Sequence, residues 1–459
     1  MLRDPLPNYK TVAIFGLGAS GLAAARLLAR FGKTLIASDT ADESKRAEIE
    51  AKLPAGTRLV LGHNEIGDAE VIVTSPGLEP SSPIFSDAKS RGIPVIAELE
   101  LGFLATDKPV VAITGTDGKT TTTTLTSHIL NTCGVRNKMG GNVGIPLCQV
   151  VAEADEPDCY VVETSAFQLV FCPEFRPHIL IATNIAEDHS EYFKGDWNAY
   201  VSTKRRPLAV MGERDIAILN ASDEEMRTWA QYTRARCMRY ANCREDFVQE
   251  SGNGAWFDGS SMHFEDGAEY VMPYAFPQFR GIHNVMNIMG AVLASHAMGC
   301  QYDAIEAAIH SYTLPHHRIE HVCEKCGVEF IDDSKATNPH AGMAALTAID
   351  KPTVLIVGGV DKGLSLTDWI VMMKKNVRRI MLIGALSDRF EREAAPVLDA
   401  GVIVRCATLE EAVTTGYKFA LQDGCTVVML SPGCSSYDMF KSYTQRGDVF
   451  AQAARAISC

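Results

Sequence analysis

Two features that mark whole classes of protein, basic runs and long apolar runs, are missing from this sequence. Lysine and arginine number 43 against 56 aspartates and glutamates, a formal net charge of −13, and we find no extended basic run. Because nucleic acids and anionic membranes repel such a chain, nucleic acid is not expected as a partner. No apolar run reaches the roughly 18 residues of a membrane span, so membrane insertion is not expected either.

Regular cysteine pairing and a secretory leader are also missing. The thirteen cysteines are odd in number and scattered, and the opening residues MLRDPLPNYK contain no apolar core of a signal peptide. Reduced thiols in a cytoplasmic protein are therefore predicted. Cys323 and Cys326 have zinc-type spacing, but a structural zinc site needs about four ligands and no second pair follows. Two ordinary thiols in a hairpin are predicted there.

The 459 residues are enough for about three domains. Short apolar runs alternate with helical patterns, as in residues 11–16 and 34–39 with a helix from about 21 to 30 between them. This alternation predicts α/β domains with parallel sheets. We place them at residues 1–106, 107–313 and 314–459, and we find no pattern that assigns residues 238–269.

A glycine-rich motif, GLGASG at residues 16–21, follows the first predicted strand and opens a helix. Asp39 ends the next predicted strand, where an acid can accept hydrogen bonds from ribose hydroxyls. Taken alone, this combination is typical of a dinucleotide-dependent dehydrogenase, and a tight turn without a ligand is the plainer alternative. A site for some nucleotide diphosphate is the better interpretation.

A second motif, ITGTDGKTTTT at residues 113–123, also joins a strand to a helix. Backbone N–H groups in such a loop bind phosphates, Lys119 can neutralise their charge, and Thr120 can ligate magnesium. The motif departs from the common phosphate loop, since Ile113 stands where that pattern begins with glycine. Two nucleotide motifs in one chain favour ATP at the second and a nucleotide-linked substrate at the first.

Three further residues have side chains suited to this chemistry. Glu163 follows an apolar strand at a position from which a carboxylate can reach the metal of a neighbouring phosphate loop. His189 follows another strand of the same segment. Judged in isolation, Glu163 could equally be a solvated loop acid, His189 an ordinary histidine, and Lys204, which lies in a helical pattern, a surface lysine.

The order of the motifs gives a more specific result. The sequence resembles the Mur ligase family from Ile14 to Gly447, and the matching strings in chain order are GTDGKTTT, ETSAFQL, NIAEDH, the Lys204 segment, GIHNVMNIMGA, LPHHRIE, FIDDSKATNPHA, GGVDKG and SPGCSSYDMFKSYTQRG. Within the family, GLGASG with Asp39, the SPG at residues 75–77, DDSKATN and SPGCSS resemble the D-glutamate-adding members.

This resemblance implies a fold, an activity and substrates. The fold is α/β in three domains: a Rossmann-like N-terminal domain, a central mononucleotide-binding domain of the P-loop ATPase type and a Rossmann-like C-terminal domain. The activity is ATP-dependent ligation of D-glutamate to UDP-N-acetylmuramoyl-L-alanine through an acyl phosphate, in cytoplasmic peptidoglycan precursor synthesis. ATP and two Mg²⁺ ions are implied, with Lys204 carbamylated to help bind the second ion. We expect a monomer.

The resemblance also implies roles for individual residues. The catalytic set is Lys119, His189 and Lys204, and the metal-binding set is Thr120, Glu163, His189 and Lys204. The implied ATP-binding residues are Gly115, Thr116, Asp117, Gly118, Lys119, Thr120, Thr121, Asn284, Asn287, His317, Arg318 and Asp333. The implied residues for the UDP-linked substrate are Ala19, Ser20, Asp39, Thr40, Gly77 and Asn142. Closure and D-glutamate binding are implied for Lys335, Thr337, Lys362, Ser436 and Tyr443, of which the last four form the D-glutamate set.

Two positions depart from the family pattern. Asp117 stands where Asn is more frequent, which adds negative charge beside the triphosphate. Tyr443 stands where Phe is frequent, a change that preserves stacking and adds a hydroxyl.

Three alternatives remain open at the level of sequence. A sister ligase would share the central motifs but add L-alanine, a diamino acid or a glutamate on folate. A dehydrogenase would turn over reduced nicotinamide without releasing ADP. A non-catalytic regulator with an ATP fold would have no reason to keep Lys119, Glu163, His189 and Lys204 together.

Overall fold

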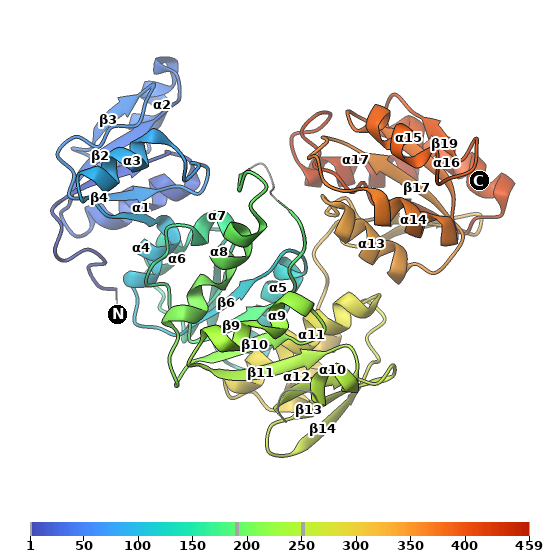
Figure 1. Ribbon diagram of the computed structural model, residues 1–459, viewed down its shortest axis with the longest axis horizontal. Coiled ribbons are helices and arrows are strands. Elements are labelled where there is room, and N and C mark those ends of the chain that lie inside the picture. The colour runs from blue at the N-terminus through green and yellow to red at the C-terminus, as the bar shows by residue number, and fades with distance from the viewer. Residues whose placement is uncertain (1, 143, 189–191, 249–252, 459) are drawn as a thin grey trace. The chain divides into compact units, whose positions relative to one another are not determined.

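The structure is a computed structural model that describes residues 2–142, 144–188, 192–248 and 253–458. Within these residues, three mainly parallel β-sheets are accompanied by helices (Figure 1). Contacts divide the chain into two compact units. The first comprises Met1–Ile185, Trp197–Tyr274 and Met286–Tyr312, and the second comprises Ala186–Asp196, Ala275–Val285 and Thr313–Cys459. The domain boundaries proposed near residues 106 and 313 stay predictions.

The first sheet of the first unit is parallel throughout, in the order β3–β2–β1–β4–β5. Its strands are β1 (Thr11–Phe15), β2 (Thr34–Asp39), β3 (Arg58–Leu61), β4 (Val71–Thr74) and β5 (Val95–Ala97). The accompanying helices are α1 (Ala19–Ala29), η1 (Glu43–Lys45), α2 (Arg46–Glu50), α3 (Pro83–Ser90) and α4 (Glu98–Leu104). The continuous apolar run of β1 suits a strand that is covered on both faces, and its residues from Val12 to Phe15 are buried.

The second sheet of this unit has nine strands in the order β14–β13–β12–β11–β10–β9–β6–β8–β7. The strands are β6 (Val110–Thr114), β7 (Asn137–Gly141), β8 (Cys159–Glu163), β9 (Ile179–Ala182), β10 (Ile216–Asn220), β11 (Arg236–Ala241), β12 (Gly254–Phe257), β13 (Ser261–Glu265) and β14 (Glu269–Pro273). Pairing is parallel from β7 to β12, and β12, β13 and β14 form an antiparallel extension. The helices in this part of the chain are α5 (Lys119–Thr132), α6 (Leu147–Val151), α7 (Ala166–Leu169), α8 (Trp197–Val210), α9 (Glu224–Arg227), η2 (Trp229–Tyr232), α10 (Arg244–Val248), α11 (Ile282–Ala297) and α12 (Tyr302–Ser311).

The sheet of the second unit has six strands in the order β15–β16–β20–β17–β18–β19, and only β15 is antiparallel to its neighbour. The strands are β15 (Glu320–Lys325), β16 (Val328–Asp332), β17 (Thr353–Gly358), β18 (Val377–Ile383), β19 (Ile403–Arg405) and β20 (Val427–Leu430). The helices are α13 (Pro339–Ala348), α14 (Thr367–Asn376), α15 (Ser387–Ala394), α16 (Leu409–Asp423) and α17 (Tyr443–Ala456).

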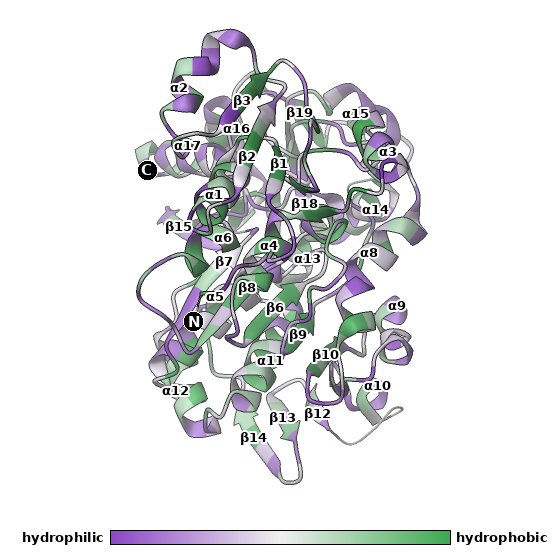
Figure 2. Ribbon diagram, turned by 90° about the vertical axis from the view of Figure 1, so that its left-hand side faces the viewer, coloured by the Kyte–Doolittle hydropathy of each residue, from purple (hydrophilic) through white to green (hydrophobic). Residues whose placement is uncertain are grey.

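Successive residues of β17 show why this last sheet is buried on both sides. Leu355 and Val357 belong to one hydrophobic cluster with residues of α13, α14 and α15. Val354 and Ile356 belong to another cluster with residues of α16 and α17. Figure 2 shows the corresponding hydrophobic colouring along the strands of the sheets. Helices on both faces leave the carboxyl ends of the parallel strands for binding ligands.

The predicted α/β class is confirmed, and two local predictions need correction. Helix α1 begins at Ala19 instead of Gly21, because extended Gly18 is its N-cap. Cys326 is disulfide-bonded, so the prediction of two ordinary thiols is wrong for this residue, although Cys323 and the other described cysteines are free. Its exposed position in the turn between β15 and β16 leaves its side chain accessible for pairing. Among the described residues, no helix is long and apolar enough to cross a membrane.

Candidate active site

The phosphate-loop motif connects β6 to α5 in the first unit, as its sequence predicts. Its backbone is held from outside the loop, since the Asp117 N–H donates to Asn184 Oδ1 at 2.9 Å and Thr183 Oγ1 donates to the Asp117 carbonyl at 2.6 Å. Lys119 Nζ donates to the Thr116 carbonyl at 2.6 Å, which keeps the cation over the loop. The loop is therefore ordered in a form that can cradle a phosphate chain.

Two glycines of the loop cannot be replaced without distortion. Gly115 has φ +139°, and a Cβ there would lie 1.9 Å from Thr183 Oγ1. Gly118 has φ +78° at the N-cap of α5, and a Cβ there would lie 2.3 Å from Asn287 Oδ1. At both positions the backbone lies so close to neighbouring residues that no side chain fits.

Glu163 ends β8 directly beside the strand that leads into the loop, in register with Ile113 of β6. Its side chain is buried, and its Oε1 accepts a hydrogen bond from Asn142 Nδ2 at 2.8 Å. Within the described part of the chain, Glu163 Oε2 has no hydrogen-bond partner. A buried carboxylate oxygen without a partner is costly, and a hard cation such as Mg²⁺ satisfies it, so Glu163 fits a metal ligand.

Lys204 is buried rather than a surface lysine, with 2% of its area exposed on helix α8. Its Nζ donates a hydrogen bond to the Gly115 carbonyl and lies 4.9 Å from the centre of the Tyr200 ring. Tyr200, one helical turn before it, shares a 2.9 Å hydrogen bond with Thr116 Oγ1. Helix α8 therefore contributes both side chains to the phosphate loop.

The other predicted site residues of the central segment lie on helices α5 and α11 or outside the described residues. Thr120 is the second residue of α5 and Thr121 the third, and Asn287 of α11 accepts a 3.2 Å hydrogen bond from Thr122 of α5. Asn284 lies in the same helix, where its Nδ2 donates to the Arg280 carbonyl at 2.8 Å. His189 lies outside the described residues.

The five N-terminal residues predicted to hold the UDP-linked substrate lie at or just after the ends of strands β1, β2 and β4, at the carboxyl edge of the first sheet. Asp39 Oδ2 accepts from the Leu17 N–H at 2.5 Å, inside the glycine-rich turn, and its Oδ1 accepts from the Ala41 N–H at 2.9 Å. Asp39 thus fixes the turn that precedes α1. Ala19 and Ser20 begin α1, and Thr40 and Gly77 are exposed on the loops beside them.

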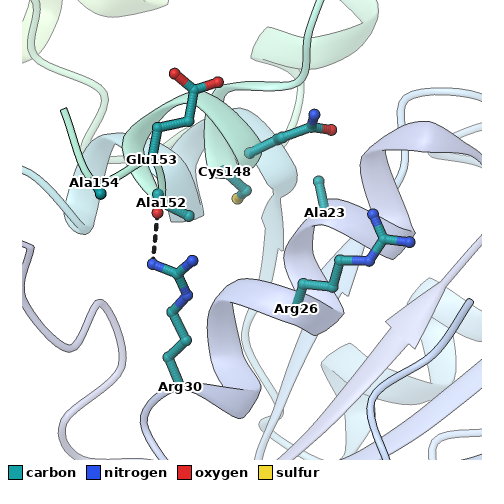
Figure 3. Close-up of a pocket in the computed structure, with 8 residues that line it drawn as sticks. Ala23, Arg26, Arg30, Cys148, Ala152, Glu153 and Ala154 are labelled. Carbon is teal, nitrogen blue, oxygen red and sulfur yellow. Dashed lines mark hydrogen bonds between the residues drawn. The ribbon is translucent and has the colours of Figure 1, made fainter.

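Helix α1 also contacts the central part of the first unit. A cavity of about 260 Å³ lies between α1 and α6. Figure 3 shows Arg30 of α1 reaching across it to the Ala152 carbonyl, at 2.5 Å. None of its lining residues belongs to a predicted site, so we assign it to packing between these helices.

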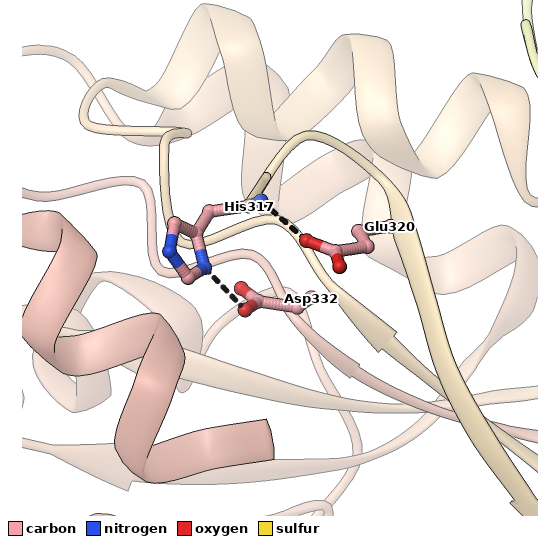
Figure 4. Close-up of side chains that lie close together, drawn as sticks. All are labelled: His317, Glu320 and Asp332. Atoms are coloured by element: carbon pink, nitrogen blue, oxygen red, sulfur yellow. Dashed lines mark hydrogen bonds and ion pairs between the residues drawn. The ribbon is translucent and has the colours of Figure 1, made fainter. Parts of the chain in front are cut away.

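In the second unit, His317 and Asp333 occupy adjoining positions on the sheet's edge. His317 Nδ1 lies 2.7 Å from Asp332 Oδ2, and this hydrogen bond raises the pKa of the imidazole (Figure 4). Asp333 follows directly and accepts from Ser431 Oγ at 2.8 Å, while burial raises its pKa to about 7. Arg318, between His317 and the start of β15, is half-buried.

His317, Asp332 and Glu320 also form the tightest group of possible metal ligands among the described residues, with their ligand atoms within 4.8 Å of one another. Glu320 already accepts from the His317 N–H at 2.7 Å and lies 2.9 Å from His316 Nδ1. These internal hydrogen bonds account for the group. Its effect is to hold His317, which has a positive φ of 66°.

Three of the residues predicted for D-glutamate, Thr337, Lys362 and Ser436, lie on loops that follow β16, β17 and β20. Lys362 Nζ lies 3.6 Å from Asp188 Oδ1, and Ser436 is buried. Tyr443 is the first residue of α17, and the Lys335 ammonium lies 4.0 Å from the centre of its ring. Thr337 is half-buried on the segment between Lys335 and α13.

Sequence patterns overlooked several residues that hold this machinery. Thr183 and Asn184 hold the phosphate loop through Asp117, and neither was assigned a role, although Asn184 opens the matching string NIAEDH. Tyr200 could have been noticed from its spacing of four residues before Lys204, which places both on one helix face. Asp188, the ion-pair partner of Lys362, lies in the matching string NIAEDH, but it was assigned no role.

Comparison with known proteins gives matches along most of the chain. Residues 10–97 match the N-terminal domain described as Mur ligase MurD-like. Residues 113–295 match the Mur ligase middle domain, and residues 317–433 match the domain described as Mur ligase, glutamate ligase domain.

Two similar solved structures are Mur ligases. The chain resembles MurF from Acinetobacter baumannii with a TM-score of 0.63 at 17% identity, covering 96% of this chain and 93% of that one. It resembles the UDP-N-acetylmuramate-alanine ligase MurC from Thermotoga maritima with a TM-score of 0.58 at 15% identity, covering 98% and 100%. At these identities the likeness concerns the fold.

Curated relatives are similar over their full length. The protein from Trichlorobacter lovleyi is 34% identical over 98% of this chain and 99% of its own length, and that from Geobacter metallireducens is 36% identical over 98% of both. Both are called UDP-N-acetylmuramoylalanine--D-glutamate ligase. This chain therefore belongs to the Mur ligase family, in the branch whose curated members have that name.

Proposed function

We propose that this chain joins D-glutamate to UDP-N-acetylmuramoyl-L-alanine in an ATP-dependent, amide-forming step of peptidoglycan precursor synthesis. The names of the relatives support this reaction. The observation that carries the proposal is the convergence of Lys119, Glu163 and Lys204 on one phosphate loop. A lysine at the phosphates and a carboxylate with an oxygen left for Mg²⁺ are groups that phosphoryl transfer from ATP uses.

The chemistry follows from the poor reactivity of a carboxylate. Transfer of the γ-phosphoryl group to an oxygen of the L-alanyl carboxylate releases ADP and gives an acyl phosphate. The amine of D-glutamate then attacks the carbonyl carbon, the resulting tetrahedral intermediate loses phosphate and a proton, and the amide remains. Lys119 is placed to stabilise negative charge during transfer, and no protein nucleophile is required.

The donors around the loop also suit magnesium. Thr120 and Glu163 would hold the first ion, and His189 with a carbamylated Lys204 would hold the second. Bound magnesium supplies positive charge at the transferring phosphoryl group. The chain's own contribution is to orient these ligands, since Asn142 fixes Glu163 through Oε1 and leaves Oε2 for the metal.

Carbamylation of Lys204 would replace its buried ammonium group with a carboxylate. The neutral amine would form a bond to the carbon of CO₂ and release a proton, which turns a cation into a carboxylate able to bind magnesium. The 2% exposure of Lys204 and its contact with the Gly115 carbonyl support this proposal, because they place the amine at the loop in a site screened from water.

Replacement of Lys204 tests the carbamate. We expect Lys204→Ala to be nearly inactive, and small carboxylates such as acetate to restore part of its activity by occupying the place of the carbamate. Phosphate release from ATP measures both effects, and Lys194→Ala, in the exposed segment before α8, is the matched control. Absence of rescue, together with a native mass spectrum under bicarbonate that shows no CO₂ adduct, would contradict the proposal.

We also propose a division of roles among the three predicted domains. Residues 1–106, with Ala19, Ser20, Asp39, Thr40 and Gly77, would bind the UDP part, and Asn142 would lie near the muramoyl chain. Residues 107–313 would bind ATP, helped by His317, Arg318 and Asp333. Residues 314–459 would bind D-glutamate through Thr337, Lys362, Ser436 and Tyr443. The reaction would take place in the cytoplasm, where ATP and nucleotide-linked substrates are available, with the enzyme as a monomer.

The proposed reaction has a direct test. ADP, phosphate and product are measured with ATP, Mg²⁺, UDP-N-acetylmuramoyl-L-alanine and D-glutamate, and again with each component omitted. We expect one ADP and one phosphate per amide, and no sustained turnover without the amino acid. ATP hydrolysis that is indifferent to both acceptor and amino acid would contradict the proposal.

A further inference from the structure

Arg446 is a buried cation that the proposed reaction does not use. It lies one turn into α17 with 1% of its area exposed. Its Nε donates to Ser334 Oγ at 3.0 Å, and its Nη2 donates to the Ser334 carbonyl at 2.7 Å. Burying a guanidinium group is costly, so its presence at a loop junction calls for an explanation beyond packing.

Ser334 connects Arg446 to residues that are predicted to bind substrate. Its N–H donates to Asp332 Oδ1 at 2.9 Å, and its hydroxyl donates to the Tyr443 carbonyl at 2.8 Å. The next residue is Lys335, whose ammonium lies over the Tyr443 ring. Arg446 therefore fixes the segment after β16 against the start of α17, and with it the Lys335–Tyr443 pair.

The third nitrogen of Arg446 reaches another loop of the same edge. A Cβ added to Gly359, which has φ +138°, would lie 3.2 Å from Nη1. The neighbouring Val360 N–H donates to the Ser435 carbonyl at 2.9 Å and so joins the loop after β17 to the loop after β20. The loops that carry Thr337, Lys362 and Ser436 thus meet around one guanidinium group.

The charge of Arg446 is not neutralised by direct contact. In the described part of the chain, Nη1 has no hydrogen-bond partner, and the charges of Asp332, Asp333 and Asp438 act on the guanidinium from nearby. Burial lowers the pKa of Arg446 to about 10, which still leaves it cationic at neutral pH. A positive charge that is screened by protein instead of water acts over a longer range.

We propose that Arg446 is a positioning residue for the amino-acid substrate: it fixes the Lys335–Tyr443 pair through Ser334 and provides positive potential that favours a dicarboxylate. This inference rests on the proposed function and extends it to a residue that does not touch the substrate. If Arg446 only stabilised the fold, its replacement would lower the free energy of unfolding and change the KM values for both substrates alike.

Four variants test this role: Arg446→Met, Arg446→Lys, Ser334→Ala and the matched control Arg455→Met, whose arginine is exposed on the same helix. We expect Arg446→Met to raise the KM for D-glutamate at least about ten-fold with the KM for ATP changed by less than about three-fold, because misplaced side chains weaken only the ligand they hold. Arg446→Lys keeps the charge and should recover part of the loss. Ser334→Ala should show a smaller increase in the same KM.

The outcomes separate this proposal from the function on which it rests. A wild type that does not consume D-glutamate would contradict the proposed function. A wild type that does, combined with an unchanged KM for D-glutamate or with equal changes for ATP and D-glutamate in the variants, would overturn the role of Arg446 alone. If Arg446→Met does not fold, as judged by thermal unfolding, Arg446→Lys and Ser334→Ala decide by the same criteria.

Discussion

At the scale of single residues, Lys119 is the cation nearest to the proposed phosphoryl transfer. We expect Lys119→Ala to lower kcat/KM more than about 10²-fold, because loss of one preorganised cation removes a few kcal/mol of transition-state stabilisation. Phosphate release from ATP measures this. Lys52→Ala removes a surface lysine that pairs with Glu48 one turn away, and it should leave activity unchanged. Near-normal turnover in a folded Lys119 variant would contradict the role of the loop.

Glu163 gives a prediction about the metal instead of ATP. Glu163→Gln keeps an oxygen for Asn142 but replaces the second oxygen with an amide nitrogen that cannot bind Mg²⁺. We expect the magnesium concentration for half-maximal activity to rise about ten-fold or more, since a charged ligand is lost. Glu153→Gln, an exposed acid in the same unit, is the control. An unaltered magnesium requirement would show that Glu163 is not a ligand.

The limits of sequence reasoning are also visible in single residues. The phosphate loop was predictable because its glycines, lysine and threonine occur at fixed spacing between a strand and a helix. Lys204 was not predictable as a buried residue without the family, since KRR in a helix is as typical of a solvated face. Its burial depends on Gly115, which lies on a separate element and meets Lys204 only after folding.

At the scale of secondary-structure elements, the antiparallel extension β12–β14 contains an acid–histidine cluster. His263 Nε2 lies 2.9 Å from Asp258 Oδ2 and Nδ1 lies 3.0 Å from Glu269 Oε1, while its ring stacks on Trp256. Burial disfavours the imidazolium, but the two hydrogen bonds outweigh this effect and raise the pKa of His263. The charged histidine therefore joins all three strands.

This cluster predicts a pH dependence with a definite sign. Because the folded-state pKa of His263 is raised, the stabilisation is present in full below the ordinary histidine pKa of about 6.5 and is lost as pH rises through the folded value. Hydrogen exchange in β12–β14, corrected for the intrinsic pH effect, should be less protected at pH 8.5 than at pH 6. His263→Gln should abolish the difference, and His310→Gln, outside the extension, should retain it. Equal protection in the wild type at both pH values would refute the assignment.

The same segment explains why elements were predicted unevenly. Strands β1, β6, β9 and β20 are continuous apolar runs between helical patterns, which is the pattern that predicts a buried parallel strand. The described part of residues 238–269 holds the end of β11, helix α10 and the short strands β12 and β13, whose inward residues include Met262 and Phe264 among polar neighbours. The stacking of Trp256 on His263 depends on strand pairing, which a periodicity confined to one segment does not reveal.

At the scale of the whole molecule, the succession of α/β regions along the chain was more predictable than the contacts between distant side chains. Family motifs spread from Ile14 to Gly447 predicted three α/β regions, and three mainly parallel sheets are present among the described residues. The motifs gave no indication that Glu163 and Asn142 share a hydrogen bond or that Arg446 joins three loops. Such contacts depend on side-chain packing between distant segments.

The choice of amino acid tests the central claim most directly, because the sister ligases share the phosphate loop and its metal ligands. kcat/KM for phosphate release is measured with UDP-N-acetylmuramoyl-L-alanine and, in turn, D-glutamate, L-glutamate, L-alanine and a diamino acid. We predict a preference for D-glutamate of at least about 10²-fold, since the L-isomer cannot place its amine and both carboxylates in the same arrangement. Equal use of L-glutamate, or a preference for the diamino acid, would contradict the proposed function while leaving the ligase chemistry intact.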